Sequence, residues 1–538
     1  MRRLVAAPGA AILAVGLGVV GTTVGTSAGA APASDERSPA AVANDYIGDH
    51  LGSIKGSTAD SYRVVDTITG VDGAQHIRYE RTYQGLPVLG GDFVVHQDAD
   101  GAVDGVSVAQ ARAIDISATP RIAAADVAAK TRHAFDGAKI ADVSKPQLVV
   151  DARYGAPQLA WMSVVHGVQS DGQTPSRATV LVDALSGEIL DADESVTTLA
   201  PLDTTSSSGN LSDDAQVADV GTGQSIYLGQ VEIDTTAGGS GFEMVDPSHG
   251  NGTTCDMNNS EAQCTTLVDD DNAWGDGTNA DRASAGVDAH LGAALTFDYY
   301  TATHNWNGIF NDGTGVPSRV HYGNAYVNAF WDGQQMTYGD GENNDRPLVS
   351  LDVAGHEMSH GVTENTAGLE YSGDAGGLNE ATSDIFGSMV EFYANNAADP
   401  GDYDIGEKID IFGTGEPLRY MYQPSLDGSS YDCWDSSVPG SDPHYSSGVG
   451  NHFFFLLAEG SGDTQYGSSP ICDGSTVTGI GRDKAAQIWF TALSQYMTST
   501  ETYSDARAHT IQAATDLYGA GSPEVQTVEA AWTAVSVS

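Results

Sequence analysis

Residues 356–360 read His-Glu-Met-Ser-His, and residues 379–384 read Asn-Glu-Ala-Thr-Ser-Asp. Residues four apart on a helix share a face, so His356 and His360 can direct both imidazoles at one ion while Glu357 stands beside it. Zinc needs a third protein ligand and an open position for water. The second segment opens another predicted helix, and Glu380 is the third ligand we expect. Together the two segments predict a catalytic zinc site.

Two aspartates flank these ligands at helical spacing. Asp384 follows Glu380 by one turn on the same face, where its carboxylate can accept the far N–H of a ligating histidine and set its tautomer. Asp352 precedes His356 by one turn, on the face of the zinc helix that carries both histidines. We therefore expect Asp384 to contact a zinc ligand and Asp352 to lie at the start of the zinc helix.

Two other zinc-protease patterns fit this segment less well. A pattern with a third histidine six positions after the second would need Gly and His at positions that are Thr363 and Thr366. A zinc aminopeptidase would carry its glutamate one position earlier, at Asn379. The spacing favours an endopeptidase, with a zinc aminopeptidase as the alternative.

Length limits the number of domains, and net charge limits the classes of partner that the protein can bind. The 538 residues are too many for one core and predict two to four domains. With 23 basic and 72 acidic residues, the net charge of −49 argues against nucleic acid and against an anionic membrane as partners. Acidity of this degree favours solubility outside the cell, and some of the carboxylates are candidates to hold calcium.

The N-terminus has the features of a secretory signal peptide. Arg2 and Arg3 precede a short apolar stretch over 11–20, and residues 28–30 read Ala-Gly-Ala, which suits a signal peptidase. We predict a signal peptide over 1–30 and secretion of the remaining chain. No later apolar run is long enough to cross a bilayer, so no membrane association is expected.

The four cysteines are predicted to form disulfides. Export places Cys255, Cys264, Cys433 and Cys472 in an oxidising compartment. None forms a close Cys-x-x-Cys pair, which argues against a cysteine zinc site. We predict Cys255 with Cys264 and Cys433 with Cys472, although the sequence alone leaves other connectivities open.

The chain changes character along its length and predicts an α+β fold. Short alternating runs, such as residues 79–83 and 92–96, indicate strands before position 197, and a Thr-, Ser- and Gly-rich segment over 204–210 resembles a cleavable linker. A β-rich lobe and a helical lobe are expected next, with the zinc site in the cleft between them. The predicted segments are a pro-region in two parts (31–110 and 111–197), a linker with the maturation site (198–218), an N-terminal catalytic lobe with the zinc helix (219–367) and a C-terminal helical lobe (368–538).

Beyond the zinc motif, longer stretches resemble one protease family. The run from His356 to Tyr371, residues 379–393, the Asn-Ala-Phe-Trp of 328–331 and the Tyr-Gly-Asp-Gly of 338–341 are similar to thermolysin and its secreted neutral-protease relatives. This resemblance covers roughly 220–538. The stretch 81–88 resembles the family's propeptide, so 31–110 is expected to be thermolysin-propeptide-like and 111–197 PepSY-like. The resemblance implies a zymogen whose propeptide acts as inhibitor and chaperone.

The resemblance implies a role for each residue of the catalytic centre. His356, His360 and Glu380 would bind one zinc ion, and Glu357 would act as general base on the water that attacks the peptide carbonyl. Tyr371 and His444 would stabilise the oxyanion. Asn379 and Asp384 would contact the zinc ligands and orient them.

One part of the family pattern is missing beside His444. Family members carry an orienting aspartate five positions upstream, where this chain has Pro439. Asp442 and Asp435 remain as alternatives for that role. A non-catalytic, metal-stabilised binding protein on the same fold is a further alternative, but such a protein should have lost Glu357, Tyr371 or His444, and all three are present.

The resemblance also implies how substrate and calcium bind. Peptide and protein substrates would lie along a strand and be cut on the amino side of Leu, Phe, Ile or Val, by an enzyme that is expected to be a monomer. One or more structural calcium ions are expected in an acidic cluster, because crowded carboxylates repel without a cation, and residues 269–271 give a weaker signal for another. The implied substrate-binding residues are Asn328, Ala329, Arg419, Val353, Ile405 and Leu418, and the implied calcium ligands are Asp352, Glu391, Asp402, Asp404 and Glu407.

Overall fold

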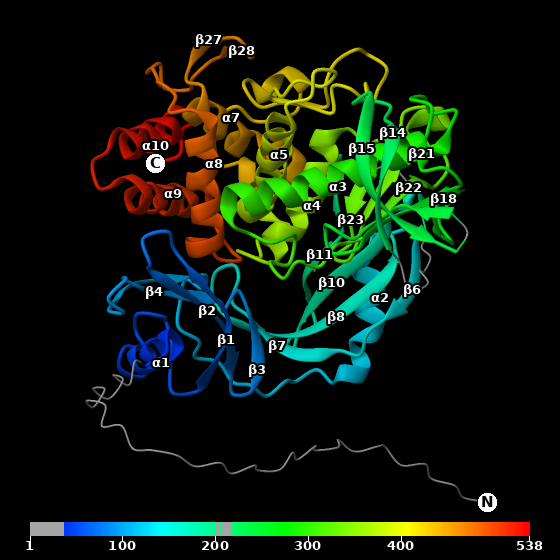
Figure 1. Cartoon of the computed structure of the whole chain (residues 1–538). Helices are drawn as coiled ribbons and strands as arrows, with labels where there is room; N and C mark the ends of the chain where they lie inside the picture. Colours follow the sequence, from blue (N-terminus) through cyan, green and yellow to red (C-terminus); the bar gives the residue numbers. More distant parts are fainter. Residues whose placement is uncertain (1–36, 201–204, 207–216, 240) are drawn as a thin grey trace, which may run out of the picture. The chain divides into compact units, whose positions relative to one another are not determined.

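The computed structural model describes residues 37–200, 205–206, 217–239 and 241–538 (Figure 1). The predicted signal peptide and most of the predicted linker lie outside these residues. Within the described part of the chain, no helix is both long and apolar enough to span a bilayer. Residues Pro39–Ser538 form one compact unit.

The first part of this unit is built on one sheet, with strands in the order β11-β10-β8-β7-β3-β2-β4-β5. A parallel pairing of β3 with β7 places Val88 opposite Val150 and joins the two predicted parts of the pro-region. Its elements are α1 (Pro39–Asp49), β1 (Asp60–Thr69), β2 (Gln75–Tyr83), β3 (Leu86–Leu89), β4 (Phe93–Gln97), β5 (Val103–Val108), α2 (Ala128–Ala134), β6 (Lys139–Val143), β7 (Gln147–Asp151), β8 (Gln158–Val168), β9 (Gly172–Gln173), β10 (Pro175–Asp183) and β11 (Ile189–Asp193).

A strand-rich region follows and contains two sheets. One sheet has the order β20-β16-β15-β14-β21, and the other β12-β23-β24-β22-β18-β17. Strand β12 (Thr197–Thr198) comes from the end of the pro-region, so this sheet combines both parts of the chain. The elements are β14 (Val217–Gln224), β15 (Gln230–Gly238), β16 (Gly241–Glu243), β17 (Val245–Asp246), β18 (Gly252–Ser260), β19 (Thr265–Thr266), β20 (Val268–Asp269), β21 (Ala273–Trp274), α3 (Arg282–His304), β22 (Ser318–Tyr322), β23 (Ala329–Trp331) and β24 (Met336–Gly339).

The remainder of the chain is mainly helical. Phe453 of α7 stacks on Trp532 of α10 at a ring-centroid distance of 3.7 Å, within one apolar core that also includes α4 and α5. A β-rich lobe followed by a helical lobe was predicted, and the structure confirms this fold class. The elements are α4 (Leu351–Glu364), α5 (Gly373–Ala394), β25 (Asp404–Ile405), β26 (Arg419–Tyr420), α6 (Pro443–Ser446), α7 (Gly448–Ala458), β27 (Gly462–Thr464), β28 (Gly467–Ser469), α8 (Arg482–Thr491), α9 (Tyr503–Tyr518) and α10 (Pro523–Ala534).

The start of the second zinc helix differs from the prediction. We expected residue 379 to open it, but α5 begins at Gly373. Glycines have low helix propensity and conceal this first turn in the sequence. A Cβ on Gly376 would lie 2.9 Å from the backbone of Tyr371, and one on Gly377 would lie 2.6 Å from the hydroxyl of Ser446. The glycines allow close packing against residues that border the site.

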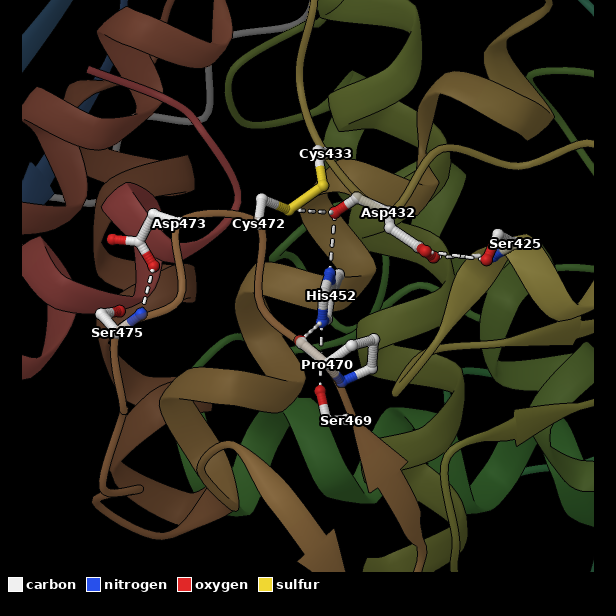
Figure 2. The surroundings of a disulfide bond; sticks show 9 residues. All are labelled: Ser425, Asp432, Cys433, His452, Ser469, Pro470, Cys472, Asp473 and Ser475. Carbon is white, nitrogen blue, oxygen red and sulfur yellow. Dashed lines mark hydrogen bonds between the residues drawn. A yellow bond between two sulfur atoms is a disulfide. The ribbon is translucent and has the colours of Figure 1, made fainter.

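Both predicted disulfides are present. Cys255 joins Cys264 across the β18–β19 turn, and Cys433 joins Cys472. Figure 2 shows the second bond beside His452, whose ring bonds the carbonyls of Asp432 and Pro470. This bond therefore ties the segment before α6 to the loop that follows β28.

Candidate metal centre and substrate cleft

Close packing of α4 on α5 brings the three predicted ligands together (Figure 1). A Cβ on Gly355 would lie 3.0 Å from the Cα of Gly387, so the two glycines let the helix backbones approach. Ligand atoms of His356, His360 and Glu380 lie within 4.8 Å of one another, and all three residues are buried. The structure thus gathers the residues that the sequence motif indicated.

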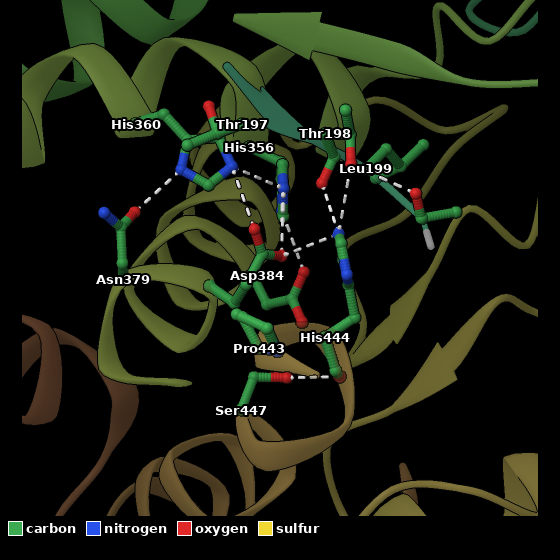
Figure 3. Close-up of polar contacts among 12 residues, drawn as sticks. Thr197, Thr198, Leu199, His356, His360, Asn379, Asp384, Pro443, His444 and Ser447 are labelled. Carbon is green, nitrogen blue, oxygen red and sulfur yellow. Dashed lines mark hydrogen bonds and ion pairs between the residues drawn. The ribbon is translucent and has the colours of Figure 1, made fainter. Parts of the chain in front are cut away.

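Hydrogen bonds behind the two histidines aim their Nε2 atoms at a common point. The Nδ1 atom of His356 lies 2.9 Å from Asp384, and that of His360 lies 2.8 Å from Asn379 (Figure 3). The two Nε2 atoms are 3.1 Å apart. Oxygens of Glu380 lie 3.6 Å from the Nε2 of His356 and 3.4 Å from that of His360. Fixing the far nitrogen in this way is how proteins orient metal-ligating histidines.

These residues fit a zinc ion. Both carboxylate oxygens of Glu357 and the Oε2 of Glu380 are buried without a hydrogen-bond partner among the residues that the structure describes. Such groups are costly to bury unless a cation or substrate satisfies them. Two nitrogens and one carboxylate are a ligand set that zinc accepts with a fourth position left for water.

The ionisation of the site also suits a cation. Burial lowers the pKa of His360 to about 3, although the charge of Glu380 opposes it, so its imidazole is neutral and able to act as a ligand. Burial alone would raise the pKa of Glu380, but His444, His360 and His356 outweigh it and lower that pKa. Burial and the charge of Glu380 raise the pKa of Glu357 well above its usual value. A bound cation would favour its ionised form.

Tyr371 and His444 both lie close to Glu380. The hydroxyl of Tyr371 hydrogen-bonds Glu380 and lies 3.4 Å from the Nε2 of His444. Asp442 accepts from the backbone N–H of His444 at 3.0 Å and lies 2.6 Å from its Nδ1. Asp435 instead bonds Ser437. Of the two aspartates left open by the sequence, Asp442 is the one that contacts His444.

Arg419 is held rigidly beside the zinc ligands. Its guanidinium donates two hydrogen bonds to Asp384, at 2.8 and 2.7 Å, although the side chain is buried. Asn451 donates to the same carboxylate at 2.8 Å. Sequence analysis missed Asn451, since nothing in its local pattern distinguishes it from other residues of a buried helix.

The segment that joins the predicted pro-region to the predicted linker, residues 197–200, lies along β23 beside the metal centre. Thr197 pairs with Trp331 and Thr198 with Phe330, in antiparallel register. The amide N–H of Leu199 donates to the carbonyl of Ala329 at 3.1 Å. This segment therefore adds a strand to the sheet edge that was predicted to bind substrate.

Side chains of the cleft hold the same segment at three further points. Asn328 accepts from the amide of Ala200 at 3.0 Å and donates to its carbonyl at 2.8 Å. Arg419 donates to the carbonyl of Leu199 at 2.6 Å. The Nε2 of His444 lies 2.6 Å from the carbonyl oxygen of Thr198, and Figure 3 shows this contact beside the zinc ligands.

The comparisons with known proteins agree with this geometry. Residues 220–364 match the thermolysin metallopeptidase catalytic domain, residues 367–537 its alpha-helical domain, and residues 60–109 the fungalysin/thermolysin propeptide motif. The bacillolysin of Bacillus cereus is 34% identical over 537 residues, which cover 92% of this chain and 90% of that protein.

The chain belongs to the thermolysin family of metallopeptidases.

Two further relatives support this membership and confirm the predicted resemblance. The thermolysin of Bacillus caldolyticus is 35% identical over 489 residues, covering 86% of this chain and 83% of that protein. The transglutaminase-activating metalloprotease of Streptomyces mobaraensis is 48% identical over 485 residues, covering 88% of this chain. The aligned region spans 60% of that relative's own length.

The acidic cluster of this thermolysin-family chain is only partly as expected. Carboxylate oxygens of Asp352, Glu391 and Glu407 lie within 4.8 Å of one another. Burial, then the neighbouring carboxylates, raises the pKa of Glu407 to about 10 and that of Glu391 well above its usual value. Carboxylates held together against their own repulsion form a setting that a divalent cation stabilises.

The other predicted calcium ligands lie at the edge of this group. Asp402 accepts from the amide of Asp404 at 2.8 Å, and its own amide donates to Glu391 at 2.9 Å. Burial and the charge of Asp402 raise the pKa of Asp404 to about 7. Asp399, which we did not predict, is fully buried, and its charge raises the pKa of Glu391. No motif in the sequence marks Asp399, and its approach to Glu391 follows from how the loop after α5 packs.

Two further acidic groups differ in whether they bring possible metal ligands together. Asp269 accepts backbone N–H groups of its own turn, and within the described ranges residues 269–271 do not gather into a set of metal ligands. Asp234, Asp246 and His249 do bring ligand atoms within 4.8 Å, a group that sequence analysis missed. His249 in that group already bonds Asp246 at 2.6 Å and Asp298 at 3.2 Å.

Arg153, a buried arginine of the pro-region, forms ion pairs with four carboxylates, one of which belongs to the catalytic part. Arg153 lies 2.6 to 3.0 Å from the carboxylates of Asp151, Asp191 and Asp193, and 3.3 Å from Glu370 of the catalytic part. Glu370 directly precedes Tyr371. The docked pro-region is therefore tied to the backbone that carries a residue of the site.

Proposed function

We propose that this chain is the precursor of a secreted zinc endopeptidase, in which His356, His360 and Glu380 hold one zinc ion. The observation that carries the proposal is the arrangement of Glu357, Tyr371 and His444 around the ligand set, since it provides one base and two hydrogen-bond donors. Bound zinc supplies a Lewis acid that polarises the attacking water and the peptide carbonyl.

The side chains of the cleft account for the remaining chemistry. Glu357 takes a proton from the attacking water and passes it to the leaving amine. His444, which Asp442 orients, donates a hydrogen bond to the oxyanion together with Tyr371. Burial would lower the pKa of His444, but Glu380 and Asp442 outweigh it and raise that pKa, so the ring can donate as a cation.

We propose that substrates bind as the segment 197–200 does. Ala329 and Asn328 hold the peptide backbone as an added strand, and Arg419 binds the carbonyl that follows the cut bond. Val353, Ile405 and Leu418 belong to the same buried apolar cluster as Leu199. This supports cleavage on the amino side of Leu, Phe, Ile or Val.

Endopeptidase action is favoured over aminopeptidase action by the bound segment. The sheet edge also pairs with Thr197 and Thr198, which lie on the amino-terminal side of Leu199. An aminopeptidase has to close that side of its site around a free amino group. The cleft of this chain instead accepts a continuous chain across the metal centre.

We further propose that the pro-region inhibits the enzyme until it is removed and that calcium stabilises the acidic cluster around Glu391. The residues over 1–30 support secretion. Digestion of an unstructured protein, such as reduced casein, tests the catalytic proposal when the fragments are sequenced. New amino termini at Leu, Phe, Ile or Val, which phenanthroline abolishes and zinc restores, are expected; fragments formed equally in phenanthroline would contradict it.

A further inference from the structure

We propose that the Thr198–Leu199 peptide bond is the bond that this chain's own active site hydrolyses during maturation. The inference rests on the proposed function and adds the position of the first cut. The sequence alone places the maturation site only within residues 198–218. The structure narrows that range through the register of one segment.

Backbone contacts define which residue occupies which position in the cleft. Leu199 donates its amide hydrogen to Ala329, and Ala200 exchanges two hydrogen bonds with the side chain of Asn328. Antiparallel pairing of Thr198 with Phe330 continues the same register. A slip by one residue would break all of these contacts at once, because alternate residues of a strand face opposite sides.

The two carbonyls that flank this bond are bound by different groups. The carbonyl oxygen of Thr198 lies 2.6 Å from the Nε2 of His444, and the Tyr371 side chain also contacts the backbone of Thr198. The carbonyl oxygen of Leu199 accepts from Arg419 at 2.6 Å. Thus the carbonyl of Thr198 faces the groups that would stabilise an oxyanion, and the next carbonyl is only held in place.

The side chain after the bond fits the proposed specificity. Leu199 is fully buried and belongs to the main apolar core, which also contains Val353, Ile405 and Leu418. Burying a leucine side chain contributes roughly 1.5–3 kcal/mol, which helps to hold the segment in this register. The proposed specificity for Leu, Phe, Ile or Val after the cut bond agrees with a cut on the amino side of Leu199.

The reaction is a balanced hydrolysis that needs no further reagent. Water adds its oxygen to the carbonyl carbon of Thr198, the C–N bond to Leu199 breaks, and Glu357 carries the proton to the leaving nitrogen. The products are a carboxylate on Thr198 and an amino group on Leu199. Arg153 and its partners then hold the cleaved pro-region by non-covalent contacts alone.

The bond can be identified in the full-length precursor, purified in a chelator and started by adding zinc. Intact mass and amino-terminal sequencing at the earliest time points should show a fragment that ends at Thr198 and one that begins at Leu199. The rate should not change on tenfold dilution, since the segment is already in the site of the same molecule. A first cut elsewhere in 199–218 would overturn the inference.

Variants provide a test with a matched control. Leu199→Asp should slow the first cut at this bond at least tenfold, because a carboxylate would enter an apolar pocket. Leu185→Asp changes an exposed leucine of the pro-region and should leave the rate unchanged. Equal rates for Leu199→Asp and wild type would contradict the proposal.

A readout that does not depend on catalysis uses the Glu357→Gln precursor. Hydrogen exchange at the backbone amide of residue 199 should be slow in this variant, because that N–H is bonded to the carbonyl of Ala329. Exchange at the same amide should become fast in the double variant that also carries Leu199→Asp. Fast exchange in Glu357→Gln alone would overturn the register.

Failure of this inference can be told apart from failure of the proposed function. If processed protein digests casein in a zinc-dependent way but no early fragment ends at Thr198, the assignment of the bond is wrong and the proposed function stands. If zinc produces neither precursor cleavage nor casein digestion, both are wrong.

Discussion

Asp384 accepts hydrogen bonds from both His356 and Arg419. One carboxylate therefore contacts a proposed zinc ligand, at 2.9 Å, and the arginine that binds the carbonyl of Leu199, at 2.7 and 2.8 Å. Its burial would raise the pKa of Asp384, but the charge of Arg419 and the hydrogen bond of His356 lower it far below its usual value. We therefore expect Asp384 to couple metal binding to substrate binding.

Replacing this carboxylate should affect both functions. In Asp384→Asn the ring of His356 loses a charged partner and Arg419 loses its anchor. Zinc affinity is expected to fall about 10- to 100-fold, and KM for a peptide substrate should rise at saturating zinc. Competition with a zinc indicator and steady-state kinetics measure the two effects. Unchanged values for both would show that Asp384 is not needed to position either residue.

Glu357→Gln should separate metal binding from turnover. The three proposed ligands remain, so zinc content should stay near that of the wild type, while kcat/KM falls by at least about a hundredfold because the base is lost. Zinc analysis and peptide hydrolysis on one sample check this. Full activity in the zinc-loaded variant would rule out Glu357 as the base.

Docking of the pro-region should weaken as pH rises. Burial is the main cause that raises the pKa of Glu370 to about 7, although Arg153 opposes it, and burial likewise raises the pKa of Asp193 to about 6. We expect separation of the pro-region to expose Glu370, so that the docked state keeps a proton that the separated state releases near pH 4 to 5. The contribution of Glu370 to the affinity for the pro-region is fully present below pH 4 to 5 and is lost as pH approaches 7.

The measurement is the dissociation constant of the cleaved pro-region between pH 5 and pH 8, with Glu357→Gln as the catalytic background. We expect the dissociation constant to increase steadily with pH, and to depend less strongly on pH in Glu370→Gln. Glu342→Gln, at an exposed position of the catalytic part, is the matched control. Tighter binding at pH 8 than at pH 5 would contradict the expected sign.

Calcium should govern stability more than chemistry. Asp352, Glu391 and Glu407 repel at short range without a cation, and Asp352 lies one turn before His356. Calcium at a hundred to a thousand times its dissociation constant would stabilise the fold by roughly 3–4 kcal/mol. Its removal is expected to open the loop that follows Glu391 and to expose it to self-digestion.

Thermal inactivation with a calcium-selective chelator, at constant zinc, tests this expectation. Glu391→Gln should shorten the half-life and reduce its dependence on calcium, whereas Asp463→Asn, at an exposed acidic residue, should behave as the wild type. A wild-type half-life that does not respond to calcium would mean that the cluster holds no structural calcium.

Local spacing was enough to indicate the metal centre and the fold class. His356 and His360 are four residues apart, and the helical repeat alone places them on one face. Asp384 was predicted behind a ligand for the same reason. The short Cys255–Cys264 loop was also within reach of sequence reasoning, because few residues separate the pair.

Tertiary structure decided the features that depend on contacts between distant segments. The choice of Asp442 over Asp435, the approach of Asp399 to Glu391 and the placement of Thr198 against His444 all follow from how loops pack, and no helical or strand repeat specifies loop packing. The sequence by itself determined the two-lobed α+β fold class and indicated the residues that gather as a candidate zinc site. Only the packed structure determined that the pro-region enters the cleft in the register of a substrate, because that register depends on hydrogen bonds to a strand about 130 residues away in the chain.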